Sequence, residues 1–476
     1  MAIGLAGAFF IFLGAGIHTL NQKPDLKVWH TAELDEEFTT KSSVSSFAEY
    51  LALEDRLFEQ LSEEVYDQIE PDDQNSINRY HRGSLSDPGR WPSNWNRSFE
   101  LGHEPSNTQP RAGVLLIHGL SDSPYSLRAI GEQLHAKGAH VVGLRVPGHG
   151  TAPSGLVDTK WQDMAAAVEI AMRHLSEQVG DRPIYMVGYS NGGALAVQYA
   201  LSALEDPELP KVQRIVLISP EIGVSPAAAL AIWQKRIGWF LGLKKLAWND
   251  VLPEYDPFKY GSFAVNAGDL AYQLTNENRI RLSRMAKQQK LGEFPPVLAF
   301  QSVVDATVSA PALVKDLFNR LPEGDHELVL FGLNRTAKME PLFKEDPTKQ
   351  IPALRNNPSR TFVFSHIVNA GPSETDVIEQ RWGIGESNSV DRDIGLRWPD
   401  NVYSLAHVAL PFPENDPVYG GDQPKERTGI SLGNIAMRGE KGVLQVSAID
   451  MLRLRWNPFY PYLEERVLQH LGLSPK

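Results

Sequence analysis

The sequence predicts an α/β fold in which a mostly parallel β-sheet carries helices on both faces. Short, continuous apolar runs, such as residues 114–117 and 184–187, are typical of strands that are buried on both sides. Longer segments with helical spacing of apolar residues, such as residues 161–178, lie between such runs. Strands that alternate with helices along a chain form parallel sheets. With 476 residues, the chain has room for one large domain with insertions or for two or three ordinary domains.

The amino-acid composition excludes or disfavours several classes of function. Hydrophobic residues make up 42% of the chain and charged residues 22%, which is typical of a folded globular protein. A net charge of −12 disfavours nucleic acid as a partner. The sequence contains no cysteine, which excludes a thiol nucleophile, disulfides and a cysteine-ligated metal. We expect neither a metal ion nor a cofactor.

The first twenty residues are apolar. Residues 2–17 carry no charge, and with the next three residues they barely reach the ~20 residues that cross a bilayer. No Lys or Arg precedes them, so the basic start of a signal peptide is missing. We therefore expect residues 1–20 to be an uncleaved membrane-anchor helix, with a cleaved signal or a buried helix as alternatives. Lys23 and Lys27 leave the side of the membrane open, because Asp25 lies between them.

Residues 21–110 form a polar, acidic N-terminal extension. Apolar residues at three-to-four spacing predict a helix over residues 47–69. Residues 72–107 are rich in Asp, Asn, Ser, Pro and Trp and are predicted to form a long loop packed by its own aromatic side chains. Whether this extension is a lid or a spacer near the membrane stays open.

The strands and helices of the main domain follow the extension. Each predicted strand is a short apolar run, and each predicted helix has a periodic apolar face. The strands are expected at residues 114–117, 141–144, 184–187, 215–218, 297–300 and 328–331, and the helices at 125–137, 161–178, 194–204, 312–321 and 461–471.

The candidate nucleophile is Ser190, in the sequence Gly188-Tyr189-Ser190-Asn191-Gly192. This G-x-S-x-G pattern lies between a predicted strand and a predicted helix, which is the context of a nucleophile elbow. Such a tight turn forces the serine into a strained conformation and leaves little room for side chains at the flanking positions. The alternative interpretation is an ordinary strand-to-helix turn.

Four segments together resemble one known family. They are Leu116-Ile117-His118-Gly119-Leu120, Val146-Pro147-Gly148-His149-Gly150, the elbow, and Gln301-Ser302-Val303-Val304-Asp305. In this order they resemble the α/β-hydrolase superfamily, most closely its carboxylesterase and monoacylglycerol-lipase-like (lysophospholipase-like) serine hydrolases. The resemblance implies an α/β-hydrolase domain over residues 111–476, with a cap insertion at about 221–292 and a second insertion at about 334–400.

The resemblance also assigns an oxyanion hole. Two backbone N–H groups, those of Leu120 and Asn191, are expected to face the negative oxygen that forms during acyl transfer. His118 and His149 are interpreted as structural residues of their loops.

The acid of a catalytic triad is expected at the end of a strand after the elbow. Asp305 lies just past the strand at residues 297–300, and a carboxylate there would orient the catalytic imidazole. The alternatives are a helix N-cap or a solvated loop acid. Asp325, the nearest competitor, lies on the wrong side of the next helix.

The base must be a histidine after Asp305. We expect His407, because it precedes a Pro-rich apolar loop over residues 408–413. His366 is the alternative, although it lies in a segment that alternates like a strand. The second insertion separates His407 from the last predicted core strand, so this assignment departs from the compact family pattern. Four histidines follow the acid: His326, His366, His407 and His470.

The expected function is hydrolysis of carboxylic esters through an acyl-enzyme on Ser190, His407 and Asp305. The partner would be an ester or lipid-like small molecule. Aromatic residues of the cap insertion suit a lid over an acyl pocket, and a helical cap core that makes no ligand contact is the alternative. Acyl transfer, amide or peptide cleavage on the same triad, and a non-catalytic membrane-tethered scaffold are the alternatives.

Overall fold

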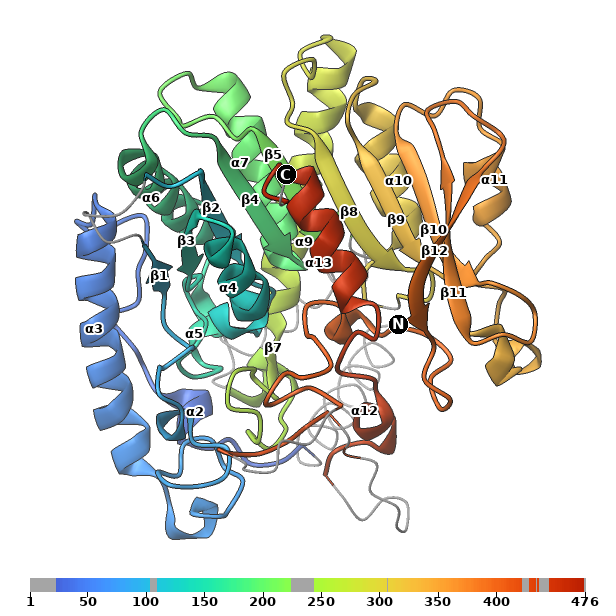
Figure 1. The fold of residues 1–476 in the computed structure, drawn as a ribbon. Coiled ribbons are helices and arrows are strands. Elements are labelled where there is room, and N and C mark those ends of the chain that lie inside the picture. The colour runs from blue at the N-terminus through green and yellow to red at the C-terminus, as the bar shows by residue number, and fades with distance from the viewer. Residues whose placement is uncertain are drawn as a thin grey trace, which may run out of the picture.

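A ten-stranded β-sheet runs through the molecule (Figure 1). The computed structural model describes residues 23–102, 109–223, 244–305, 307–421, 428–433, 435 and 445–474. In chain order the strands of this sheet are β1 (Phe99–Leu101), β2 (Ala112–Ile117), β3 (Ala139–Leu144), β4 (Ile184–Tyr189), β5 (Arg214–Ile218), β8 (Val297–Ser302), β9 (Glu327–Phe331), β10 (Val363–Asn369), β11 (Asp376–Trp382) and β12 (Val390–Arg397). In space their order is β1-β3-β2-β4-β5-β8-β9-β10-β11-β12.

The strands from β3 to β10 in this spatial order are parallel. Only the edges are antiparallel, with β1 at one side and β11 and β12 at the other. Every residue of β2, β3, β4 and β8 is buried. The mostly parallel sheet predicted from the sequence is thus confirmed, and its apolar strand sequences match strands covered on both faces.

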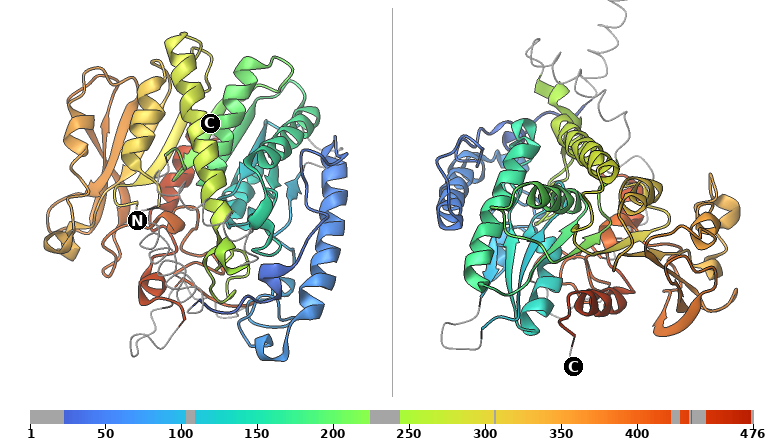
Figure 2. Two further views of the ribbon diagram at one scale, coloured as in Figure 1. Left: turned by 180° about the vertical axis from the view of Figure 1, so that it is seen from behind. Right: turned by 90° about the horizontal axis from the view of Figure 1, so that it is seen from above.

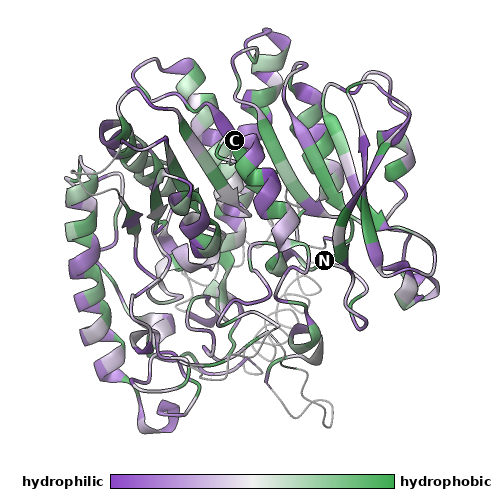
Figure 3. Cartoon of the chain, viewed as in Figure 1, coloured by the Kyte–Doolittle hydropathy of each residue, from purple (hydrophilic) through white to green (hydrophobic). Residues whose placement is uncertain are grey.

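Helices cover both faces of the sheet. The helices α4 (Arg128–Ala136) and α13 (Tyr460–His470) pack on the face toward the viewer in Figure 1. The opposite face, seen from behind in Figure 2, carries α6 (Trp161–Val179), α7 (Asn191–Glu205) and α9 (Val265–Lys287). Figure 3 shows the central strands mostly in the hydrophobic colour and the outer helices in mixed colours. The remaining elements are α2 (Val28–Thr31), α3 (Phe47–Glu64), α5 (Gly155–Asp158), α10 (Ala310–Asp316), α11 (Ile351–Arg355), α12 (Ala448–Leu452) and the strand pair β6 (Trp248–Asp250) and β7 (Phe263–Ala264).

The long helix α3 of the N-terminal extension packs against α6. It begins where the sequence predicts because Ser46 and Glu49 form a capping box, in which each side chain accepts a hydrogen bond from the other residue's backbone N–H. It ends at residue 64, earlier than predicted, because Val65 leaves the helical conformation and buries its side chain.

A buried ion cluster holds the extension to the sheet. The guanidinium of Arg145, just after β3, donates to both carboxylate oxygens of Glu37 at 3.0 Å and to Glu54 of α3 at 3.0 Å. Glu37 also accepts the backbone N–H of Gly148 at 2.9 Å. The extension thereby fixes the loop that follows β3, and because these charged side chains are largely buried, each partner depends on the others.

Part of the second insertion, predicted at about residues 334–400, folds into β10, β11 and β12, which continue the sheet beyond β9. Arg392 of β12 donates to the buried Glu379 of β11 at 3.0 Å, and Tyr462 of α13 donates to the same glutamate at 2.7 Å. Charged residues on the last strands also protect an open sheet edge from further pairing.

The predicted loop over residues 72–107 also contains a strand that the sequence analysis missed. β1 lies in it and pairs antiparallel with β3. This strand has only three residues, too few for a periodic pattern to be visible in the sequence.

Two predictions concern residues outside the described part of the chain. The predicted anchor helix at residues 1–20 lies there, as do residues 224–243 of the cap insertion. Among the helices that the described residues form, none combines the length and the apolar character needed to cross a bilayer.

We predict that Glu54→Ala lowers the free energy of unfolding by about 3 kcal/mol, because it leaves the buried Arg145 without one carboxylate partner. The matched control is Glu36→Ala, which breaks an exposed pair with Arg56 and should cost less than about 1 kcal/mol. Urea unfolding of both variants measures the difference. Equal losses would mean that the buried cluster adds no more stability than a surface pair.

Candidate active site

The backbone of Ser190 is strained at the junction of β4 and α7. Its φ is +52° and its ψ −117°, a region that L residues rarely occupy. Its N–H donates to the carbonyl of Ile218 on β5 at 3.0 Å, and its carbonyl accepts the N–H of Glu221 at 2.9 Å. Hydrogen bonds to the neighbouring strand therefore hold the strained turn, as expected of a nucleophile elbow.

Glycines around the elbow are required because backbone segments lie in contact there. A Cβ on Gly192 would lie 2.0 Å from the carbonyl oxygen of Ile117, and one on Gly188 would lie 2.5 Å from the carbonyl oxygen of Gly192. The elbow thus packs directly on the end of β2, where the loop that follows β2 begins.

The loop after β2 passes beside the serine. A Cβ on Gly119 would lie 3.1 Å from the Cβ of Ser190. The next residues are Leu120 and Ser121, and Ser121 has a positive φ of +62°. The carbonyl of Ser121 accepts the N–H of Tyr260 at 2.8 Å, which holds this second strained turn from the cap side.

The two residues predicted to form the oxyanion hole therefore lie on segments that meet at Ser190. Asn191 is the first residue of α7, so its N–H has no acceptor within the helix. Leu120 lies in the loop that touches the serine. Backbone donors at a helix start favour negative charge.

Asp305 lies three residues after the end of β8, with its side chain completely buried. Its Oδ1 accepts the backbone N–H groups of Thr307 at 2.9 Å and Val308 at 3.0 Å. Its Oδ2 accepts from Nδ1 of His407 at 2.9 Å. One oxygen thus shapes the loop and the other orients the imidazole. The helix N-cap of α10 is Ser309, which makes the alternative reading of Asp305 as that cap wrong.

His407 reaches Asp305 because the chain returns, after the second insertion, to the end of β9. Leu333, just after β9, forms an antiparallel bridge with Ser404. The N–H of Asn334 donates to Tyr403 at 2.9 Å, and its side-chain amide donates to the carbonyl of Val402 at 2.8 Å. These bonds close the excursion, so the loop with the histidine follows β9 in space, although not in sequence.

The imidazole of His407 is 5% exposed and lies against Tyr189, the residue before the serine, with ring centroids 5.4 Å apart. Its Nδ1 is engaged by Asp305, which leaves Nε2 as the nitrogen that can accept a proton.

His366 lies elsewhere. It sits within β10, its Nδ1 is 3.4 Å from the guanidinium of Arg355, and its ring is buried beside Gly332. Burial, together with Arg355 and Arg335, lowers the pKa of His366 to about 3. The structure therefore does not bring this histidine to Asp305.

The two loop histidines are held by backbone groups. His118 accepts the N–H of Val146 at 3.0 Å and bonds the carbonyl of Gly119 at 2.8 Å. His149 bonds the carbonyl of Pro147 at 3.0 Å. Burial, more than any nearby charge, lowers the pKa of each, to about 4 for His149. His118 therefore links the loop after β2 to the loop after β3, whereas His149 holds its own loop after β3 and packs against the ring of His118.

Two buried carboxylates near the elbow were not anticipated from the sequence. Glu221 follows β5 and accepts from the side-chain amide of Asn191 at 3.0 Å. Asp122 follows the oxyanion loop and pairs with Lys259 at 3.1 Å. The strand-end rule that found Asp305 could also have found Glu221, because β5 ends beside the elbow. Within the described residues, no cluster of His, Asp and Glu side chains is arranged to hold a metal ion.

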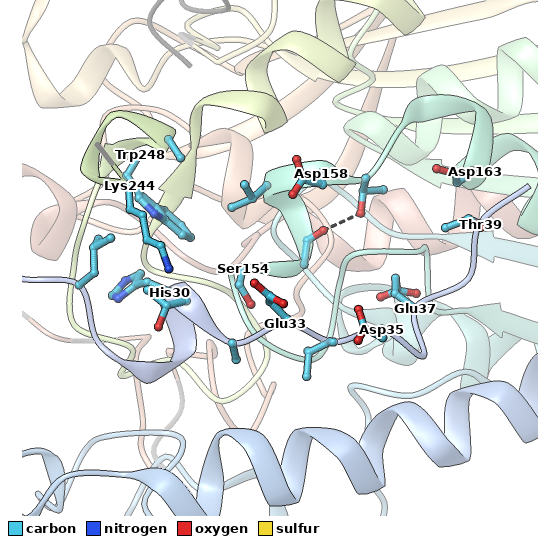
Figure 4. Close-up of a pocket in the computed structure, with 18 of the residues that line it drawn as sticks. His30, Glu33, Asp35, Glu37, Thr39, Ser154, Asp158, Asp163, Lys244 and Trp248 are labelled. Atoms are coloured by element: carbon cyan, nitrogen blue, oxygen red, sulfur yellow. Dashed lines mark hydrogen bonds between the residues drawn. The ribbon is translucent and has the colours of Figure 1, made fainter. Parts of the chain in front are cut away.

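A cavity of about 650 Å³ lies apart from these residues, between the extension, α5 and residues 244–248. Figure 4 shows Glu33, Asp35 and Glu37 of the extension along one side, with Asp158 of α5 opposite. Neither Ser190 nor His407 lines it.

The chain is similar to known proteins over about half of its length. Residues 108–331 match the family described as serine aminopeptidase, S33. The thermostable monoacylglycerol lipase of Bacillus sp. (strain H-257) is 27% identical over 231 residues, 48% of this chain and 78% of that protein. The solved structure of a metagenome-derived lipolytic enzyme is 23% identical with a TM-score of 0.37, covering 50% of this chain and 87% of that one. The monoacylglycerol lipase of Paleococcus ferrophilus is 20% identical with a TM-score of 0.37, covering 49% and 88%.

We predict that Gly192→Ala prevents the elbow from forming, because the added methyl would overlap the carbonyl oxygen of Ile117. The loss of stability should exceed about 3 kcal/mol, since backbone atoms cannot move aside cheaply. Gly292→Ala is the matched control, because a Cβ there meets no atom within 4 Å. Thermal unfolding of both variants provides the measurement. A Gly192→Ala protein as stable as the control would contradict the contact geometry around Ser190.

Proposed function

We infer that this chain, which belongs to the α/β-hydrolase superfamily, is a serine hydrolase that cleaves carboxylic esters. The single observation that carries the inference is the 2.9 Å hydrogen bond between Asp305 and His407, which lie 102 residues apart in the chain. The imidazole in that bond contacts Tyr189, the residue before the strained Ser190, and a serine needs such a base to become a nucleophile at neutral pH.

The proposed reaction has two halves. Ser190 Oγ attacks the ester carbonyl while Nε2 of His407 takes the hydroxyl proton, and the same imidazole then protonates the departing alcohol. The acyl group is left on the serine oxygen. In the second half His407 removes a proton from water, the resulting nucleophile attacks the acyl carbon, and the acid product leaves as the proton returns to Ser190.

Asp305 and the oxyanion donors have separate tasks in this reaction. The buried carboxylate keeps the imidazole oriented and stabilises its cation. The N–H groups of Leu120 and Asn191 stabilise the oxygen of the tetrahedral intermediate, and each such donor is typically worth about 3 kcal/mol. The strained turns at Ser190 and Ser121 support this role, since they fix both segments before the substrate arrives.

The proposed substrate is a lipid-like ester, by analogy with the monoacylglycerol lipase of Bacillus sp.. Hydrolysis of a p-nitrophenyl ester series, from acetyl to palmitoyl, tests both activity and acyl length. A fluorophosphonate probe separates the enzyme from a non-catalytic scaffold, because only an activated Ser190 is labelled.

Peptide-bond cleavage is a second candidate, favoured by the family's description as a serine aminopeptidase. The same triad can attack esters and amides, and the fold does not decide between them. Parallel assays with an aminoacyl p-nitroanilide and a p-nitrophenyl ester discriminate the two activities.

We also propose that residues 2–20 attach the protein to a membrane as an uncleaved helix, since they are apolar and uncharged over almost the length that spans a bilayer. A membrane-attached hydrolase would meet lipid-like esters where they concentrate. The side of the membrane is left open.

We predict that Ser190→Ala and His407→Ala each lower kcat/KM for p-nitrophenyl butyrate by several orders of magnitude. The two losses should be similar because the members of a triad act as a unit. His366→Ala is the matched control and should keep most activity, because that histidine lies in β10 and away from Asp305. The reverse ranking of the two histidine variants would reject His407 as the base.

We predict that the full chain partitions with membranes and that a chain starting at Lys23 is soluble and active. A start at Lys23 keeps the hydrogen bond from the side-chain Nζ of Lys23 to the carbonyl of Trp248, and it keeps the stacking of Trp29 on Tyr80. Fractionation with an ester assay measures both properties, and the mass of the membrane-bound form reports whether the segment is cleaved. A full chain found only in the soluble fraction would rule out the anchor.

A further inference from the structure

Glu221 occupies a position that the proposed triad does not use. It follows β5, the strand between β4, which ends at the elbow, and β8, which leads to Asp305. Its residue is 9% exposed, and its backbone N–H donates to the carbonyl of Ser190 at 2.9 Å. Both ends of the residue therefore face the elbow rather than solvent.

The carboxylate of Glu221 holds the first residue of α7. Its Oε2 accepts from the side-chain amide of Asn191 at 3.0 Å. The backbone N–H of Asn191 is one of the two proposed oxyanion donors, so Glu221 fixes the segment that carries it. Together with the bond to Ser190, this makes two contacts from one residue to the turn.

The role of the Glu221 carboxyl at Asn191 does not depend on its charge. Burial raises the pKa of this carboxyl, whereas the hydrogen bond from Asn191 and the nearby His407 lower it. In either protonation state the carboxyl keeps an oxygen that can accept from the Asn191 amide.

We propose that Glu221 is a positioning residue of the active site, which holds the turn at Ser190 and Asn191 so that the backbone N–H of Asn191 faces the oxyanion. This proposal rests on the proposed esterase function. It predicts that an uncharged side chain that still accepts the hydrogen bond from Asn191 also keeps the activity.

The test compares Glu221→Ala with Glu221→Gln. Alanine removes the acceptor of the Asn191 amide, so kcat for p-nitrophenyl butyrate should fall by about 10- to 100-fold while KM changes less than about two-fold, because the oxyanion donor acts mainly in the transition state. Glutamine still offers a carbonyl oxygen to Asn191 and should restore kcat to within a few-fold of the wild-type value.

Glu254→Ala is the matched control. Glu254 is also buried and also accepts hydrogen bonds, from the backbone N–H groups of Gly261 and Ser262. Its substitution should leave kcat within a few-fold of the wild-type value. Thermal unfolding of all three variants verifies that each one is folded.

The outcomes separate the two proposals. Wild-type protein that neither hydrolyses the ester nor takes up a fluorophosphonate refutes the esterase function itself. An active wild type together with an undiminished kcat in Glu221→Ala refutes the role of Glu221 alone. An equal loss of kcat in Glu254→Ala refutes it as well, because the loss would then not depend on the contact with Asn191.

Discussion

The contact of three backbone segments around Ser190 is the constraint on which the site depends. The turn at residue 190 has a positive φ, the carbonyl of Ile117 leaves no space for a side chain at Gly192, and β5 supplies the acceptor for the serine N–H. Since each segment is the end of a parallel strand, the sheet itself brings them together. The strain at the serine is thus balanced by bonds that only the assembled sheet provides.

A second closure places the other half of the site. The strands β10, β11 and β12 widen the sheet by three strands beyond β9. The bridge between Leu333 and Ser404 nevertheless returns the chain to the end of β9. The histidine loop therefore keeps its place beside the acid despite a long insertion. At the other edge of the sheet, ion pairs of Arg145 with Glu37 and Glu54 attach the N-terminal extension to the loop after β3.

Local patterns were sufficient for the inner part of this fold. The buried strands, the elbow and Asp305 could be predicted because apolar runs and strand ends are visible in short windows of sequence. The extra strands could not be predicted in full, since β1 is too short and β12 too exposed to show a period. The choice of His407 over His366 depended on a return path that no local pattern encodes. Glu221 was missed because its partner, Asn191, becomes a neighbour only after β5 pairs with β4.

The covalent intermediate offers the most direct test of the central claim. Protein is mixed with excess p-nitrophenyl ester, and the reaction is quenched in acid during the first turnovers. The protein is then digested, and the masses of its peptides are measured by mass spectrometry. We predict that the acyl mass appears on the peptide carrying Ser190 and at no other serine or histidine. Turnover with an unmodified Ser190 peptide, or with the acyl group on another residue, would contradict the mechanism.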